Sequence, residues 1–97
     1  MSKKEDGFLM YRGRPLVRSG NTIYHGNMWE KMVMMYQIMS TKKQGDVEVA
    51  DKVMMQLLYT DPEMSPRQRV VKRGEKDSLY AAFDVGTVWL EMNLAKA

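Results

Sequence analysis

The residues whose types and spacing could do chemistry are concentrated in one short basic stretch. Residues 64–76 hold five basic side chains against one acidic side chain, a local charge of +4 (five minus one), while the whole chain carries +3. Arg and Lys at such offsets can neutralise nucleic-acid phosphates, and tyrosines on an open sheet face can stack on bases. On a helix, the same basic side chains would form an ordinary solvated face. The candidate nucleic-acid contacts are Arg67, Arg69, Lys72, Arg73 and Lys76, and the candidate stacking residues are Tyr11, Tyr24, Tyr36 and Tyr59.

Other residues capable of chemistry are few and scattered. His25 is the single histidine, and acidic residues are sparse around it, whereas metal sites usually need three or four converging ligands. We therefore expect His25 to be an ordinary residue at the surface or rim. Glu48 and Asp51 fall on opposite faces of a strand, so they predict solvated charge rather than a pair of catalytic carboxylates.

Sequence patterns that bind phosphates or activate a nucleophile are missing from the chain. Neither Gly-x-Gly-x-x-Gly nor Gly-x-x-x-x-Gly-Lys-Ser/Thr occurs, and there is no Gly-x-Ser-x-Gly and no cysteine. We expect no catalytic residues, no metal and no cofactor, and so a protein that is not an enzyme.

Composition indicates a small globular domain. The chain has 97 residues, of which 44% are hydrophobic and 28% charged, and we take residues 1–97 as one domain with residues 1–7 as a flexible start. A chain this short keeps a thin stability margin that dimerisation would increase. The absence of cysteine permits a reducing compartment, and no apolar run reaches the length of a membrane span, so we expect a cytoplasmic protein with no membrane contact.

Methionine is unusually abundant, with eleven residues. Methionine fills irregular cores and also forms adaptable binding surfaces. Two apolar segments hold most of the internal methionines, and for these we favour core packing over a contact surface. They are Met32, Met34, Met35, Met39, Met54 and Met55.

The N-terminal half has the pattern of a β-meander followed by a hairpin. Short β-prone stretches at residues 8–11, 15–18 and 22–25 are separated by turn-forming residues. Residues 30–41 and 47–60 fit either a helical or a strand period, and their β-branched and aromatic content favours a long β-hairpin with a loop at residues 42–46. A helical hairpin in residues 28–60 is the alternative.

Two helices are expected in the C-terminal third. Ser65 followed by Pro66 is typical of a helix start, which predicts two turns over residues 66–73 that stop at Gly74. Asp77 can cap a longer helix whose apolar stripe should pack on the sheet. Gly86 lies within that stripe, and a close approach to a strand or a partner helix would explain it. The stripe consists of Leu79, Ala82, Phe83, Gly86, Trp89, Leu90, and Asn93 or Leu94.

Several segments resemble a family of small uncharacterised bacterial proteins. The resemblance is carried by residues 16–26 (LVRSGNTIYHG), 49–53 (VADKV) and 60–62 (TDP) and by the helix over residues 79–94, so it covers most of the chain. It implies a compact bacterial cytosolic domain and transfers no activity and no site residues.

Together these patterns predict an α+β domain in which the meander and hairpin form an antiparallel sheet, with the C-terminal helix packed on one face. Because residues 32–39 are apolar on both sides, one face needs a further cover, and a homodimer supplies it. We expect a small non-enzymatic interaction or scaffolding module that binds protein, often another copy of itself. The alternative is a nucleic-acid-binding protein that uses the basic stretch at residues 67–76.

Overall fold

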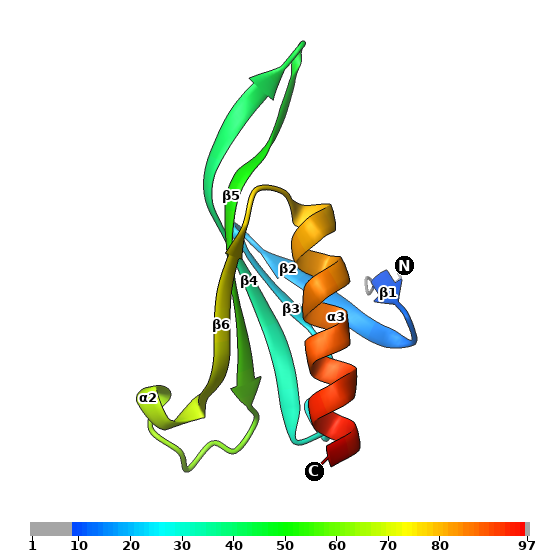
Figure 1. The fold of residues 1–97 in the computed structure, drawn as a ribbon, viewed down its shortest axis with the longest axis vertical. Helices are drawn as coiled ribbons and strands as arrows, with labels where there is room; N and C mark the ends of the chain where they lie inside the picture. Colours follow the sequence, from blue (N-terminus) through cyan, green and yellow to red (C-terminus); the bar gives the residue numbers. More distant parts are fainter. Residues whose placement is uncertain (1–8, 97) are drawn as a thin grey trace.

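The structure is a computed structural model that describes residues 9–96, so the predicted flexible start and Phe8 lie outside the described residues. Six strands form one antiparallel sheet in the order of the sequence, and a long helix lies against it (Figure 1). This confirms the predicted α+β architecture. The elements are β1 (Leu9–Tyr11), β2 (Arg14–Ser19), β3 (Thr22–His25), β4 (Met32–Gln44), β5 (Val47–Tyr59), α2 (Pro66–Arg69), β6 (Val70–Lys76) and α3 (Leu79–Lys96).

The meander at the start of the sheet is the one that the sequence predicts. Its first turn is a two-residue turn, because Tyr11 pairs directly with Arg14. The residues between them, Arg12 and Gly13, have φ angles of 53° and 83°. Two consecutive positive φ angles match the right-handed twist of the flanking strands, so this turn leads β1 straight back into β2.

The long hairpin is confirmed, but its turn is shorter than predicted. β4 and β5 pair from Met32 and Tyr59 up to Gln44 and Val47, which leaves a two-residue turn instead of a loop over residues 42–46. The helical alternative for residues 28–60 is therefore wrong. Beyond a register shift around Ser40, the two strands leave the body of the protein as a two-stranded arm (Figure 1).

The segment after α2 is the main correction to the predicted fold. Ser65 starts α2 as expected: its Oγ accepts a hydrogen bond from the backbone N–H of Gln68, and the Gln68 side chain accepts one from the backbone N–H of Ser65. The helix ends at Arg69, however, and β6 follows and pairs with β5. The β-branched pair Val70 and Val71 favours a strand, and the free edge of β5 provides backbone partners that a continued helix would leave unpaired.

The helix α3 covers one face of the sheet. Ser78 caps it, because its Oγ accepts a hydrogen bond from the backbone N–H of Ala81, so the predicted cap at Asp77 is wrong. The predicted stripe does face the sheet, and Gly86 lies so close to β4 that a Cβ there would overlap the Tyr36 side chain. Within residues 9–96, no helix is both long and apolar enough to cross a membrane.

Candidate interaction surface

Side chains alternate along the strands, so the sheet has two faces, and these differ in what covers them. Residues paired across the strands share a face, as in the row that runs from Val17 through Tyr24, Met35 and Gln56 to Arg73. This row lies on the face opposite α3, which we call the open face. Among the described elements, none is stacked on it, while α3 contacts β4, β5 and β6 from the other side, the covered face (Figure 1). The open face includes Met10, Pro15, Val17, Thr22, Tyr24, Val33, Met35, Gln37, Met39, Lys52, Met54, Gln56, Leu58, Arg73 and Glu75.

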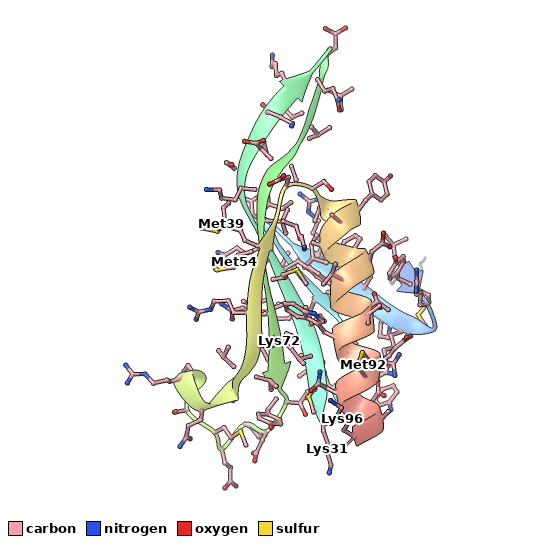
Figure 2. The ribbon with its side chains drawn as sticks, viewed as in Figure 1. Lys31, Met39, Met54, Lys72, Met92 and Lys96 are labelled. Carbon is pink, nitrogen blue, oxygen red and sulfur yellow. The ribbon has the colours of Figure 1, made fainter. Side chains whose placement is uncertain are left out.

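The methionines are divided between the two faces. Those on the covered face are buried in the core, namely Met32, Met34 and Met55. Met39 and Met54 lie on the side of the sheet away from α3 (Figure 2), and Met39 keeps 52% of its surface exposed. The prediction that all six methionines pack in the core is therefore wrong for half of them. The missed signal was the strand period, which sends neighbouring residues to opposite faces.

The open face is poor in charge. Its charged residues are Lys52 on β5 and Arg73 and Glu75 on the edge strand β6, so the part contributed by β1 to β4 carries none. Charged residues make up 28% of the chain as a whole. Depletion of charge together with enrichment in methionine and aromatic residues is typical of the centre of a protein interface.

One corner of the open face is hollowed and carries a protruding loop. The loop between β3 and β4 places Met28 and Trp29 in solvent, with Trp29 85% exposed. Beside them lies an apolar hollow of about 570 Å³. The hollow is lined by Met10, Pro15, Val17, Tyr24, Gly26, Asn27, Met28 and Trp29.

The loop that carries Trp29 is fixed by polar contacts on both sides of it. Arg14 donates two hydrogen bonds to the Glu30 carboxylate, at 2.9 and 3.1 Å, and Asn27 donates a third at 3.0 Å. The Thr60 hydroxyl donates to the Glu30 carbonyl oxygen at 2.6 Å, which ties the loop to the end of β5. The hydrogen bond from Arg14 lowers the pKa of Glu30, so the carboxylate stays ionised over the neutral pH range. These contacts hold the loop in one conformation, so Trp29 is exposed to solvent on an ordered loop.

The five predicted nucleic-acid contacts do not form one helix face. Arg67 and Arg69 belong to α2, and Arg69 donates to the Met64 carbonyl oxygen at 3.2 Å. Lys72 lies on the side of α3, with its Nζ 4.6 Å from the centre of the Trp89 ring. Along β6, alternation puts Lys72 and Lys76 on the covered face and Arg73 on the open face. Charged side chains on an edge strand also discourage pairing with other chains.

The tyrosines divide in the same way. Tyr24 lies on the open face and is partly exposed. Tyr36 is fully buried under α3, and burial raises its pKa well above the ordinary value. Tyr11 packs against Phe83 of α3, and Tyr59 is paired with Met32 on the covered face. Of the four candidate stacking residues, only Tyr24 therefore belongs to the open face.

His25 is fully buried, so the prediction of a surface or rim histidine is wrong. Its Nε2 lies 2.7 Å from the Tyr11 carbonyl oxygen, and because a carbonyl only accepts, Nε2 carries the proton and donates. Nδ1 has no hydrogen-bond partner among the described residues. Burial lowers the pKa of His25, which keeps the ring neutral. The signal was present in the sequence, since strand alternation places His25 on the same face as Ile23.

The remaining features offer little for catalysis. Within residues 9–96, no three His, Asp or Glu side chains are grouped so that they could hold a metal ion. A second hollow of about 750 Å³ lies between the arm and the start of α3. Its lining mixes Arg18 and Lys42 with Glu48 and Asp77, and His25 is not part of it.

Comparisons with protein-family models, curated proteins and solved structures give no match for this chain.

Proposed function

We propose that this protein is a non-enzymatic interaction module that forms a homodimer through the open face of its sheet. The observation that supports the proposal most strongly is the charge-poor, methionine-rich surface over β1 to β5, which no described element covers. Contiguous exposed apolar surface of this kind marks interaction sites in soluble proteins. We also propose a cytoplasmic location, which the cysteine-free composition permits.

The size of the surface suits a second copy of the chain. Five strands about 4.8 Å apart, each offering about five residues at roughly 3.4 Å, give a flat area of roughly 400 Å² before side-chain relief is counted. The protruding Met28 and Trp29 extend this area at one corner. A standard interface buries about 800 Å² of accessible surface per partner, so the flat area of the face is about half of that size, and side-chain relief and the corner add to it.

Charge also favours a copy over an acidic or basic partner. The open face holds two positive side chains, Lys52 and Arg73, and one negative side chain, Glu75, and the rest of it is uncharged. A partner with one sign of charge would gain nothing from the uncharged part of the surface. A two-fold interface brings the same patch together from both subunits, so it needs a surface that is complementary to itself.

Analytical ultracentrifugation of two matched variants tests the proposal. Met39→Glu places a charge on the open face at a side chain that is 52% exposed, and Met92→Glu places the same charge on α3 at one that is 54% exposed (Figure 2). We expect the wild type and Met92→Glu to be dimers and Met39→Glu to dissociate at least about tenfold more readily. A wild type that stays monomeric at about 100 µM would overturn the proposal.

Nucleic-acid binding is the competing function, and its own experiment separates the two. Arg67 and Arg73 are exposed, so the double variant Arg67→Glu, Arg73→Glu reverses two charges of the basic stretch without changing the core. Fluorescence anisotropy of labelled single-stranded RNA and DNA at about 50 and about 200 mM salt measures binding. We expect no saturable binding by the wild type. Saturable binding that weakens with salt and is lost in the variant would favour the nucleic-acid hypothesis.

A further inference from the structure

The corner of the open face combines a protruding side chain with a cavity beside it. Trp29 projects from the β3–β4 loop and, together with Met28, forms one wall of the apolar hollow of about 570 Å³. We infer that, in the proposed homodimer, Trp29 of each copy inserts into the corner hollow of the other. This inference rests on the proposed self-association and adds which side chain anchors it and where it binds.

The chemistry of the hollow suits an indole ring. Cavities of about 300–1,000 Å³ accommodate drug-sized ligands, so there is room for one Trp side chain. The walls contributed by Met10, Val17 and Tyr24 are apolar or aromatic. Methionine adapts its shape and makes favourable contacts with aromatic rings. Trp is also among the residues that most often dominate the binding energy of an interface.

The pinned loop reduces the cost of binding. Glu30 follows Trp29 directly and is held by Arg14 and Asn27, while Thr60 holds its backbone. The loop therefore does not have to become ordered when a partner arrives. Side chains presented in the bound conformation lose less entropy on association, which strengthens the contact.

The arrangement also satisfies the symmetry of a dimer. In a two-fold interface, a residue that enters a site on the partner must have its own site within reach of the partner's residue. Trp29 and the hollow share one corner, so a two-fold axis in the contact plane near that corner pairs both at once. When this two-fold axis extends across the middle of the sheet, the open faces of the two copies lie against each other, with Met35 near the centre of the contact.

Alanine substitutions at two equally exposed aromatic residues provide the first test. Trp29 is 85% exposed on the corner loop, and Tyr80 is 86% exposed on α3. We expect Trp29→Ala to weaken dimerisation by about 30-fold, as for an interface hot spot. Tyr80→Ala should dimerise like the wild type. Because both side chains lie in solvent in the single chain, neither variant should impair folding.

Tryptophan fluorescence gives a second readout that does not depend on a loss of affinity. The chain has two Trp residues, so subtracting the spectrum of Trp29→Phe from that of the wild type isolates Trp29. As the concentration rises through the dimerisation range, we expect the Trp29 emission to shift to shorter wavelength and its quenching by acrylamide to fall.

The outcomes separate this inference from the proposed function. A dimer in which Trp29 stays quenchable and Trp29→Ala has wild-type affinity would overturn the inference and leave the open-face dimer in place. A wild type that remains monomeric would overturn both. A dimer that protects Trp29 and is weakened by Trp29→Ala but not by Tyr80→Ala would support the inference.

Discussion

The two faces of the sheet are built from the same strands, with similar residues, and differ in what covers them. On β4, Met34 and Tyr36 are fully buried beneath α3, whereas Met35 on the open face is only half-buried and Met39 is exposed. A strand that is apolar on both faces needs two covers, and the described chain provides one. The covered face thus accounts for the stability of the fold, and the open face accounts for the proposed association.

Neighbouring methionines on β4 give the sharpest test of this difference. Met34 belongs to the core cluster, while Met35 belongs to the open face. We expect Met34→Ala to lower the free energy of unfolding by about 2–5 kcal/mol, because it leaves a cavity beneath α3. We expect Met35→Ala to cost less than about 1 kcal/mol in dilute protein, where the open face is in solvent.

Concentration distinguishes the two methionine variants further. Association stabilises only the folded chain, so the Tm of the wild type should rise with protein concentration. Met34→Ala should keep this dependence at a lower Tm, and Met35→Ala should lose most of it. Thermal melts followed by circular dichroism at about 1 and about 100 µM provide the measurement. Equal losses in both variants at low concentration would contradict the division into two faces.

Gly86 tests how tightly α3 is seated on the covered face. In Gly86→Ala the added Cβ would overlap the Tyr36 side chain, which is fully buried beneath α3. We expect a loss of about 1–2 kcal/mol, even though Ala favours a helix over Gly by about 1 kcal/mol. Urea denaturation measures the change.

A second substitution checks the cause of that loss. The Tyr36 hydroxyl oxygen is the atom nearest to the position that a Cβ at Gly86 would occupy. Tyr36→Phe removes this oxygen, so the double variant should recover part of the stability lost in Gly86→Ala. Strictly additive effects in the double-mutant cycle would show that the close approach is not the cause.

The sequence predicted the elements whose signals are local. Turn residues at Arg12 and Gly13 marked the start of the meander, and Ser65 followed by Pro66 marked the start of α2. The apolar stripe of the last helix and the unexplained Gly86 within it together predicted a close contact with the sheet, which the approach to Tyr36 confirms.

The errors arose where a distant partner decides the structure. A helix start at Ser65 and basic residues at helical spacing favoured a helix through Arg73, but the free edge of β5 recruits Val70–Lys76 as a strand. Strand alternation places His25 on the face of Ile23, but only the packing of the distant helix α3 makes that face the buried one. For the open face, the sequence predicted that a cover was needed, but only the strand register shows which methionines lie on it.

The buried His25 makes the covered face sensitive to pH. Its pKa is lowered from 6.5 in the folded chain by burial, so the unfolded chain binds the proton more readily. The contribution of His25 to the free energy of unfolding is therefore fully present above about pH 6.5 and is lost as the pH falls below that value. We expect chemical denaturation to show falling stability from about pH 7 to about pH 5.

A His25→Gln variant serves as the control for the pH effect. The Gln amide donates a hydrogen bond as the ring does, but it does not titrate in this range. Its stability should change little between about pH 7 and about pH 5. Glu30, whose pKa is lowered by Arg14, adds its own loss only below its ordinary value of 4.5. A wild type and variant with the same pH dependence would assign the effect to other groups.

The smallest effect is expected where the basic stretch meets the covered face. The Lys72 Nζ lies 4.6 Å from the centre of the Trp89 ring, while Arg73 points to the other side of β6. Lys72→Met keeps the apolar stem and removes the charge, so it should cost about 0.5–1 kcal/mol through the lost cation–π contact. Arg73→Met should stay within about 0.5 kcal/mol of the wild type. Urea denaturation at constant ionic strength compares them, and equal effects in the two variants would make Lys72 an ordinary solvated charge.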